Sequence, residues 1–243
     1  MKYAISKVLI WNRFVKVLLI GGAITIAACA GDGLVSTPGV QVVTQHNNPQ
    51  RTGANLAETM LTPARVASQN FGLLGSYAVT GQVFAQPLYV SGVNITGRGL
   101  RNVLIVATAA NWLYAFDADN PNSQDLWSYH AGAPVPGARI YGSEKEAAIS
   151  PEIGIIGTPV IDIAHSTIYF VDMTEPNLFH TLHAVDIRDG SVRRTVRVTG
   201  NIEGGGTFNP AKQNQRAALA LVKDRVYVAW TSLMTSTHTM GSS

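Results

Sequence analysis

Two stretches of the sequence carry side chains that could coordinate a metal ion. His180 and His183 stand three residues apart, and the run from Asp117 to Asp125 is rich in side-chain oxygen atoms. Successive side chains of a β-strand point to opposite faces, so two histidines three apart diverge and do not share one ion. The acidic run lacks the Gly at its sixth position and the Glu at its twelfth that an EF-hand loop requires. The sequence therefore predicts a strand and an Asx-stabilised turn here, and no metal site.

The familiar catalytic motifs are missing from the sequence. Neither Gly-x-Ser-x-Gly nor His-Glu-x-x-His occurs in the 243 residues, although α/β-hydrolases and helical zinc peptidases depend on them. The glycine run 204–206 is not followed by Lys-Ser or Lys-Thr, so it predicts a loop and not a phosphate-binding cradle. We therefore assign no catalytic residue from the sequence.

Composition places the chain among globular proteins. The residues are 46% hydrophobic and 14% charged, which excludes an intrinsically disordered chain. Lys and Arg outnumber Asp and Glu by 18 to 15, but four basic residues and no acidic one precede Cys29. Removing those four leaves 14 basic residues against 15 acidic ones. Because the remaining chain has no basic surplus, we expect no nucleic-acid partner.

Residues 1–28 have the pattern of an export signal. Four basic residues are spaced along the apolar start of the chain, and Val17–Ala28 then contains no ionisable side chain. That apolar run has about half the roughly 20 residues that a membrane-spanning helix needs, so it predicts a removed signal peptide. The single cysteine, Cys29, follows directly and excludes an intramolecular disulfide framework.

The segment Ile26-Ala27-Ala28-Cys29 resembles a bacterial lipobox, in which an aliphatic and two small residues precede the cysteine that receives the lipid. This interpretation gives a cell-envelope lipoprotein held to the membrane through Cys29, with residues 29–43 as a tether. Two alternatives stay open. Ala28-Cys29-Ala30 also fits ordinary cleavage, which would release a soluble secreted or periplasmic protein, and Cys29 could belong to an uncleaved anchor helix. All three place the folded part outside the cytoplasm.

The sequence beyond residue 70 contains an internal repeat. Leu113–Asp117 (LYAFD) is matched by Leu182–Asp186 (LHAVD), and QPLYV at 86–90 is matched by TPVID at 158–162, in both cases about 70 residues further on. Each unit contains four short runs rich in β-branched and aromatic residues. They predict strands at 85–90, 103–108, 112–117 and 126–129, and again at 157–162, 167–172, 181–186 and 192–198.

A third unit begins with expected strands at 217–222 and 225–230. Four antiparallel strands per repeat are typical of a β-propeller blade. We therefore predict an all-β fold, a partial propeller of about two and a half four-stranded blades within residues 44–243.

Several segments resemble one family of propellers. LYAFDADNPNSQDLW at 113–127, NNPQRTGANLAETMLTP at 47–63 and SPEIGIIGTPVID at 150–162 are similar to the PQQ-like (pyrroloquinoline-quinone-like) β-propeller repeat proteins of the bacterial envelope and exterior. The resemblance covers about residues 44–232 and implies the propeller fold. Quinoprotein dehydrogenases of this fold hold PQQ over two neighbouring cysteines beside a calcium ion. Because this chain has one cysteine, we expect neither PQQ nor calcium as a cofactor.

The resemblance implies a binding or scaffold module of the cell envelope, whose partners are other envelope proteins or an extracellular glycan. The alternative is a remnant of an enzyme, either a quinoprotein-type dehydrogenase or a polysaccharide-active propeller. Two and a half blades fall short of the about four to eight that close a ring. The tail 232–243 shows neither strand alternation nor a turn pattern. We interpret it as a truncated propeller read out of frame, with a true short tail as the alternative.

Charged residues in the long loops provide the candidate ligand-binding site. Glu152 lies before the first strand of the second unit, Arg139 lies in the same long loop, and Arg216 holds the equivalent position before the third unit. First strands line the central channel of a propeller, so a carboxylate that enters there could bind a cation or polar ligand, with Arg216 as its counter-ion. The alternative is a structural role, in which these charges hold neighbouring blades in register.

Overall fold

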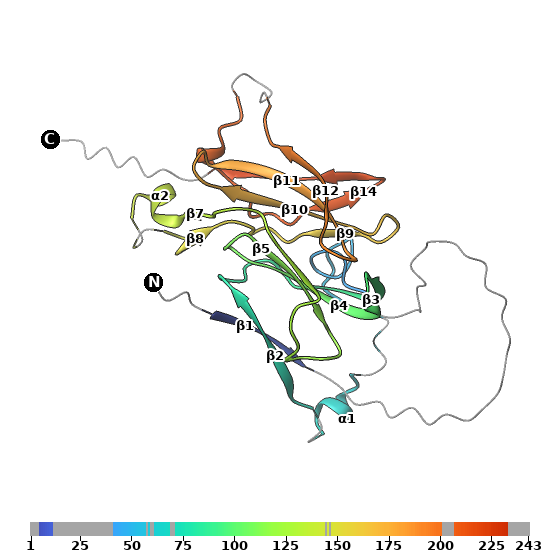
Figure 1. The fold of residues 1–243 in the computed structure, drawn as a ribbon. Helices are drawn as coiled ribbons and strands as arrows, with labels where there is room; N and C mark the ends of the chain where they lie inside the picture. The colour runs from blue at the N-terminus through green and yellow to red at the C-terminus, as the bar shows by residue number, and fades with distance from the viewer. Residues whose placement is uncertain are drawn as a thin grey trace.

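The computed structural model of the chain describes residues 5–11, 41–56, 58, 61–68, 71–143, 145, 147–200 and 207–232. Within these residues the fold is almost entirely β-structure (Figure 1), as the sequence predicts. The helical elements are short: α1 (Pro63–Val66), α2 (Gly137–Tyr141) and the 3-10 turn η1 (Pro210–Lys212). No helix among the described residues is long and apolar enough to span a membrane.

Two four-stranded antiparallel sheets form the centre of the fold, and their strands confirm the two repeats. The sheet that we call blade 1 has the order β3 (Leu88–Ile95), β4 (Gly99–Ala107), β5 (Trp112–Asp117) and β6 (Trp127–His130). The sheet that we call blade 2 consists of β9 (Val160–Asp162), β10 (Thr167–Thr174), β11 (Phe179–Asp186) and β12 (Val192–Arg197). Each strand pairs with its neighbour in the chain, because short turns join antiparallel strands.

A two-stranded sheet packs on the outer face of each blade (Figure 1). On blade 1 lies β2 (Leu73–Thr80), which pairs with β1 (Ile5–Trp11). On blade 2 lies a hairpin of β14 (Ala220–Val222) and β15 (Arg225–Tyr227), which confirms the start of the third unit. The layers therefore follow the order β1–β2, blade 1, blade 2 and β14–β15.

Two further short pairs complete the described β-structure. β7 (Val135–Pro136) pairs with β8 (Glu152–Ile153), and β13 (Gln213–Asn214) pairs with β16 (Thr231–Ser232). β1 falls within the predicted leader, whereas Cys29, the tether up to residue 40 and residues 233–243 lie outside the described residues. The cleavage, lipidation and reading-frame interpretations therefore stay predictions.

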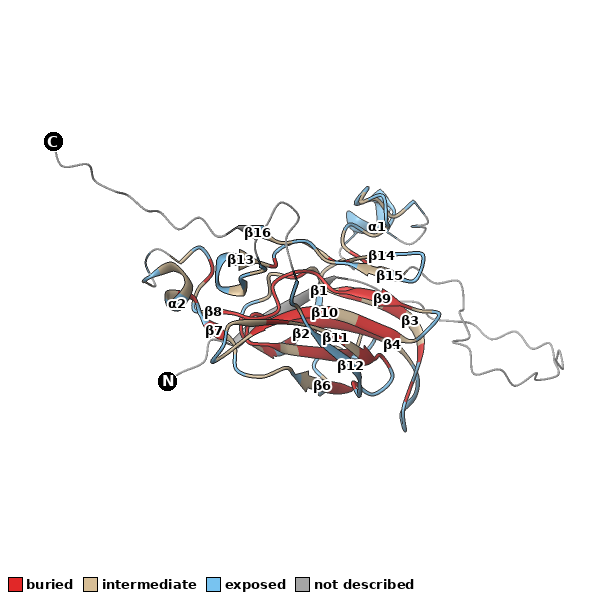
Figure 2. Ribbon diagram, turned by 90° about the horizontal axis from the view of Figure 1, so that it is seen from above, coloured by how far each residue is buried: buried red, intermediate tan, exposed pale blue. Residues whose placement is uncertain are grey.

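The largest apolar cluster lies between the facing sides of the two blades. On β4, Val103 and Ile105 point toward blade 2, whereas Leu104 and Val106 point toward β2. This alternation follows from the strand geometry, which sends successive side chains to opposite faces. From blade 2, the fully buried Phe170 enters the same cluster. The central strands are accordingly mostly red in Figure 2, and the outer elements are tan and blue.

Trp127, on the outer strand of blade 1, joins the two blades. Its side chain is buried, and its Nε1 donates a hydrogen bond to the carbonyl oxygen of Ile187 over 2.9 Å. The indole covers the turn of blade 2 at Gly190, where a Cβ atom would lie 2.6 Å from Trp127 Cε3. Gly190 also has a φ of +73°, so two independent requirements select glycine there.

The segment 41–55, which we call the strap, crosses the first strands of three sheets. Val42 pairs with β3, and Val43 accepts a hydrogen bond of 2.9 Å from the backbone of β9. Arg51 Nη2 donates to the carbonyl oxygen of Leu219, directly before β14, over 2.9 Å. The strap thus holds the three sheets together through backbone contacts of two valines and the side chain of Arg51.

The turn after the third strand has the same construction in both blades. The backbone N–H of Asp119 donates to Asp117 Oδ1 over 3.1 Å, and that of Arg188 donates to Asp186 Oδ1 over 2.9 Å. Such Asx turns satisfy the backbone within the turn itself. The prediction of an Asx-stabilised turn after Asp117 is confirmed.

Of the two turn aspartates, Asp117 and Asp186, the carboxylate of Asp186 accepts more hydrogen bonds from arginine side chains. Burial alone would raise the pKa of Asp186, but hydrogen bonds from Arg188 and Arg193 outweigh burial and lower the pKa to about 2. A lowered pKa means that the folded state favours the carboxylate, so this stabilisation is complete above the ordinary pKa and is lost as the pH falls toward 2.

We expect Asp186→Asn to lower the free energy of unfolding at pH 7 by about 2 kcal/mol, because a pKa lowered from 3.8 to about 2 corresponds to roughly that amount at about 1.4 kcal/mol per pKa unit. The difference from wild type should shrink steadily between pH 5 and pH 3, as measured by urea unfolding at each pH. Asp224→Asn, at an exposed position, serves as the control and should leave the pH profile unchanged. A difference that stays constant with pH would contradict the assignment.

Candidate functional site

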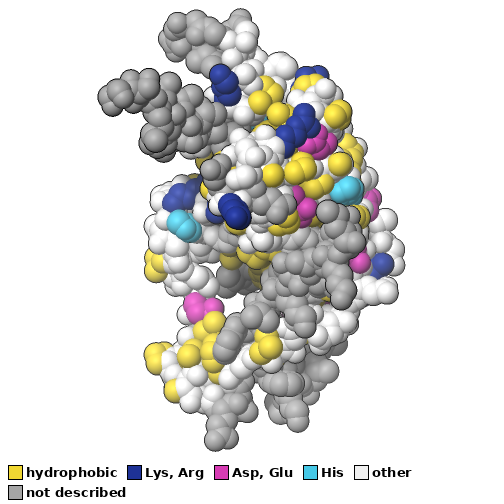
Figure 3. All heavy atoms as spheres, turned by 90° about the vertical axis from the view of Figure 1, so that its left-hand side faces the viewer, with side chains coloured by type: hydrophobic (Ala, Val, Ile, Leu, Met, Phe, Trp, Pro, Cys, Tyr) yellow, Lys and Arg dark blue, Asp and Glu magenta, His cyan; other side chains and the backbone are white. Residues whose placement is uncertain are grey.

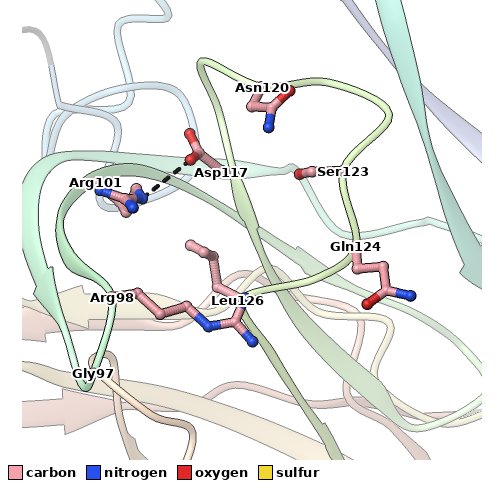
Figure 4. Close-up of a pocket in the computed structure, with 8 residues that line it drawn as sticks. All are labelled: Gly97, Arg98, Arg101, Asp117, Asn120, Ser123, Gln124 and Leu126. Carbon is pink, nitrogen blue, oxygen red and sulfur yellow. Dashed lines mark ion pairs between the residues drawn. The ribbon is translucent and has the colours of Figure 1, made fainter.

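A pocket of about 590 Å³ opens at the turn end of blade 1 (Figure 4). The β3–β4 turn and the start of β4 form one wall, and the connection between β5 and β6 forms the other. The lining residues are mostly polar or charged: Gly97, Arg98, Arg101, Asp117, Asn120, Ser123, Gln124 and Leu126.

The charged groups of the pocket are held by the surrounding structure. Arg101 Nε lies 3.3 Å from Asp117 Oδ2, and Arg101 Nη1 donates to the carbonyl oxygen of Leu100 over 2.7 Å. Arg98 Nη1 reaches the carbonyl oxygen of Asp125 over 3.4 Å. Each guanidinium has five donors in a planar fork, and these contacts use two on Arg101 and one on Arg98. Further donors are left for a ligand.

The lining determines what kind of ligand the pocket can take. Arg98 supplies donors only, Asp117 supplies acceptors, and the amides of Asn120 and Gln124 supply both. The hydroxyl oxygen of Ser123 is buried and has no hydrogen-bond partner within the described structure. Small-molecule pockets are generally apolar with few polar groups, whereas this one is polar almost throughout. It therefore suits a ligand rich in hydroxyl or anionic groups.

The sequence did not predict this pocket, although one of its walls lies in the oxygen-rich run Asp117–Asp125. The pattern of Asp117–Asp125 suggested only a metal loop or a turn. Nothing in the sequence predicted Arg98 and Arg101 as site residues. Their contribution depends on the β3–β4 turn, which folds back beside the β5–β6 connection. The two arginines in the glycine-rich segment TGRGLR at 96–101 are the signal that could have suggested it.

The three residues predicted to bind a ligand lie apart from this pocket. Arg139, on α2, forms an ion pair with Glu175 and donates to the carbonyl oxygen of Pro176 over 2.8 Å. Arg216 Nη1 donates to the carbonyl oxygen of Ile156 over 3.2 Å, and its guanidinium lies 5.7 Å from the ring centre of Phe84. These contacts connect α2 to the segment at Glu175 and Pro176, and the segment at Arg216 to the one at Ile156.

Glu152 stands in β8, opposite Pro136 of β7. Burial raises the pKa of its carboxyl group, and a Cβ atom on Gly81 would lie 3.1 Å from Glu152 Oε1. Within the part of the chain that the structure describes, no ion pair of 4 Å or less joins Glu152 to Arg216 or Arg139. The predicted role of Glu152, Arg139 and Arg216 as a ligand site stays a prediction.

The two histidines of β11 point to opposite faces, as predicted. His183 stacks on Phe170 between the blades, with ring centres 4.8 Å apart. His180 is buried on the other face against Phe208 and Trp230, and burial lowers its pKa. Among the described residues no three His, Cys, Asp or Glu side chains are grouped so that they could hold a metal ion.

His183 belongs to a buried hydrogen-bonded chain that the sequence did not suggest. Its Nε2 lies 3.1 Å from Asp172 Oδ2, and its Nδ1 lies 3.3 Å from the hydroxyl oxygen of Tyr129. The arrangement is consistent with Nε2–H donating to the carboxylate and the tyrosine hydroxyl donating to Nδ1. Burial, and then the charge of Asp172, raise the pKa of Tyr129. Because His183 and Asp172 are buried between the blades, the chain acts as an inter-blade contact.

The described Lys and Arg side chains on the face shown in Figure 3 do not form a continuous basic surface. Its Lys and Arg side chains stand apart from one another, with polar and apolar atoms between them (Figure 3). A nucleic-acid-binding surface would gather these charges into a patch or stripe.

Comparisons with known proteins give a limited result. No protein-family model matches the chain, and no curated protein matches it. Among solved structures it is similar to the crystal structure of BamB from Moraxella catarrhalis, with a TM-score of 0.35 and 13% sequence identity. The match covers 67% of this chain and 51% of that one, so the chain spans about half the length of that structure. By the order and pairing of its strands, the chain is an all-β protein with two complete blades of a partial β-propeller.

Proposed function

We propose that the chain is an exported binding module of the bacterial cell envelope, without catalytic activity of its own, and that it binds an extracellular glycan. The pocket at the turn end of blade 1 carries this proposal. Its guanidinium groups can pair with acidic groups on a glycan, and its guanidinium, carboxylate and amide groups can pair with sugar hydroxyls. The polar loops of a rigid β-scaffold are also where binding residues are commonly found.

The glycan proposal predicts a specific effect of pocket substitutions. Isothermal titration calorimetry with soluble peptidoglycan fragments should detect binding to the wild-type protein. Arg98→Ala and Asn120→Ala should each weaken that binding about tenfold, since each removes hydrogen bonds worth about 1.4 kcal/mol. Maltohexaose, a neutral oligosaccharide, tests whether acidic groups are needed.

Lys212→Ala is the matched control, because Lys212 is exposed on η1 and does not line the pocket. It should bind like wild type. Equal binding by the pocket variants, or no binding of either oligosaccharide, would contradict the proposal. A stoichiometric complex with an envelope protein that the pocket variants leave intact would favour the scaffold role instead.

The anchor on Cys29 forms a separate part of the proposal, supported by the lipobox-like segment before it. We expect metabolic labelling with an alkyne palmitate analogue to mark the wild-type protein, because only an acylated cysteine takes up the label. Cys29→Ser should abolish the label and release the protein from the membrane fraction. Equal labelling of both proteins would contradict acylation at Cys29, and no labelling of either would contradict the lipoprotein assignment and favour simple secretion.

The chain's own residues do not fit a quinoprotein site. With Cys29 as the single cysteine, no pair of neighbouring cysteines is available to contact PQQ. The oxygen-rich run after Asp117 is used for an Asx turn. We therefore assign no PQQ or calcium to the proposed function, and incubation with both should give neither a shifted cofactor spectrum nor dye reduction.

A further inference from the structure

The pocket at the turn end of blade 1 carries one positive charge that none of its own side chains balances. Three of its lining residues are charged: Arg98, Arg101 and Asp117. Arg101 Nε lies 3.3 Å from Asp117 Oδ2, so these two charges offset each other. Within the part of the chain that the structure describes, no ion pair of 4 Å or less joins Arg98 to an acidic side chain. The guanidinium of Arg98 is therefore the charge that a ligand can meet.

Two further aspartates stand near the pocket but do not line it. Asp119 Oδ2 accepts a hydrogen bond from Asn102 Nδ2 over 2.7 Å. Asp125 offers its backbone carbonyl oxygen to Arg98 Nη1 over 3.4 Å. Because both carboxylates add negative charge around the pocket, a group with two negative charges is repelled more strongly than a group with one. The surroundings therefore favour a ligand group that carries a single negative charge.

Blade 2 provides an internal comparison. Its aspartate at the corresponding place, Asp186, accepts hydrogen bonds from Arg188 Nε and Nη2 and from Arg193 Nη2, over 3.0, 2.8 and 2.6 Å. The β9–β10 turn at 163–166, which corresponds to the turn that carries Arg98, contains no arginine. An arginine that the turn aspartate does not bind is thus a property of blade 1 and not of the repeat.

The turn that carries Arg98 is held in place by its own backbone and by blade 2. Gly97 and Gly99 both have a φ of +71°, a conformation that favours glycine. The backbone N–H of Thr96 donates to the carbonyl oxygen of Arg188 over 3.1 Å. A Cβ atom on either glycine would meet no atom within 4 Å, so the turn leaves open space around Arg98. Figure 4 shows the arginine extending from this turn toward the β5–β6 connection.

The free guanidinium and the neighbouring amides fit a carboxylate on a hydroxylated ligand. A guanidinium has five donors in a planar fork and can bind both oxygens of one carboxylate. The contact with Asp125 uses one of the donors of Arg98. The amide side chains of Asn120 and Gln124 line the opposite wall and supply both donors and acceptors for hydroxyl groups.

We propose that the pocket selects an acidic glycan, whose free carboxylate binds the guanidinium of Arg98 while its hydroxyls pair with Asn120 and Gln124. This inference rests on the proposed function and adds that negative charge decides which glycan is bound. Two sources provide such a carboxylate, the ring of a uronic acid and the stem peptide of peptidoglycan. A phosphate group is a poorer fit, because its second negative charge is repelled by Asp117 and by the two aspartates beside the pocket.

The first test compares ligands that differ only in charge. Isothermal titration calorimetry is performed with an oligogalacturonate and its methyl ester, and with peptidoglycan fragments before and after amidation of their carboxyl groups. We expect blocking of the carboxylates to weaken binding about tenfold, because a hydrogen bond to a charged group is lost. Sodium chloride at about 0.5 M should reduce this preference, since salt screens exposed charges.

The second test assigns the charge to Arg98. Arg98→Gln retains an amide donor but has no charge, so it should bind the acidic and the blocked glycan with nearly equal affinity. Arg98→Lys retains the charge without the planar fork and should keep part of the preference. Arg194→Gln is the matched control, because Arg194 is exposed on β12 and does not line the pocket. It should keep the whole preference.

A third variant should increase affinity. Asp117→Asn removes the negative charge of the pocket but keeps an oxygen that can accept from the backbone N–H of Asp119. We expect the acidic glycan to bind this variant roughly threefold more tightly, the effect of one solvent-exposed charge. Damage to the fold would not produce such a gain.

The outcomes separate this inference from the proposed function. If a blocked glycan binds as tightly as its acidic form, the selection by charge is wrong and glycan binding stands. If Arg98→Gln keeps the whole preference, the assignment to Arg98 is wrong. If none of the four ligands binds, the proposed function fails and this inference fails with it. Charge-dependent binding of the oligogalacturonate alone supports a ring carboxylate, and that of the peptidoglycan fragments alone supports a stem-peptide carboxylate.

Discussion

Replacing Trp127 with alanine is expected to lower the free energy of unfolding by about 4 kcal/mol, a large part of the stability of an ordinary domain. The substitution removes a buried indole and leaves a cavity over the turn at Gly190. It also leaves the carbonyl oxygen of Ile187 without the donor that lies 2.9 Å away. Because both losses occur between the blades, the variant should unfold at a lower urea concentration as a single unit.

Trp127→Phe separates the two contributions. Phenylalanine retains most of the ring packing but has no N–H group. We therefore expect the free energy of unfolding to fall less than in the alanine variant. The expected loss is that of one hydrogen bond, about 1 kcal/mol, together with the small cost of the cavity. Equilibrium urea unfolding followed by circular dichroism measures both variants. If Trp127→Ala cost less than about 1 kcal/mol, the indole would not be the contact that joins the blades.

Replacing Asp172 with alanine is expected to cost about 3 kcal/mol. The carboxylate accepts hydrogen bonds from His183 Nε2 over 3.1 Å and from the backbone N–H of Thr181 over 3.1 Å. Asp172 is 2% exposed, so water cannot replace these bonds. Donors buried without a partner cost about 1–3 kcal/mol each, and bonds to charged groups lie at the high end.

Two further variants distinguish loss of the hydrogen-bonded chain from loss of packing. Asp172→Asn keeps one acceptor oxygen at nearly the same volume and should recover about half of the stability. Combining Asp172→Ala with His183→Phe removes the donor that Asp172→Ala leaves unpaired, so the double variant should be more stable than additivity predicts. Additive losses in urea unfolding would contradict the coupling of these two side chains.

The repeat made most of the fold predictable. Strands at 112–117 and 181–186 follow from two copies of the same five-residue pattern, and the structure has β5 at 112–117 and β11 at 179–186. β2 was not predicted, because LLGSYAVT at 73–80 has no matching copy and gains its burial from Tyr77 and Val79 against blade 1. A pattern within a segment does not reveal a contact made across the fold.

The candidate site was predictable only where its contacts are local. The Asx turn after Asp117 depends on Asp119, two residues away, and the sequence suggests it. The pocket forms only because Arg98 lies beside Asp125, which is 27 residues further along the chain. No sequence motif predicts the turn that brings these two residues together. The link between His183 and Tyr129 spans 54 residues and two blades, which explains why histidine spacing alone could not suggest it.

The strap has a consequence for the order in which the chain can fold. Arg51 and Leu219 are 168 residues apart in sequence, and their hydrogen bond joins the strap to the segment directly before the β14–β15 hairpin. Closing a loop of that size has an entropic cost that only later contacts offset, and folding slows as contacts become more distant in sequence. Val42 and Val43 can pair with β3 and β9 once blades 1 and 2 have formed, whereas Arg51 can bind only after the segment at Leu219 has folded. The contact between Arg51 and Leu219 is therefore expected to form last, and the Arg51 end of the strap stays accessible to a protease until then.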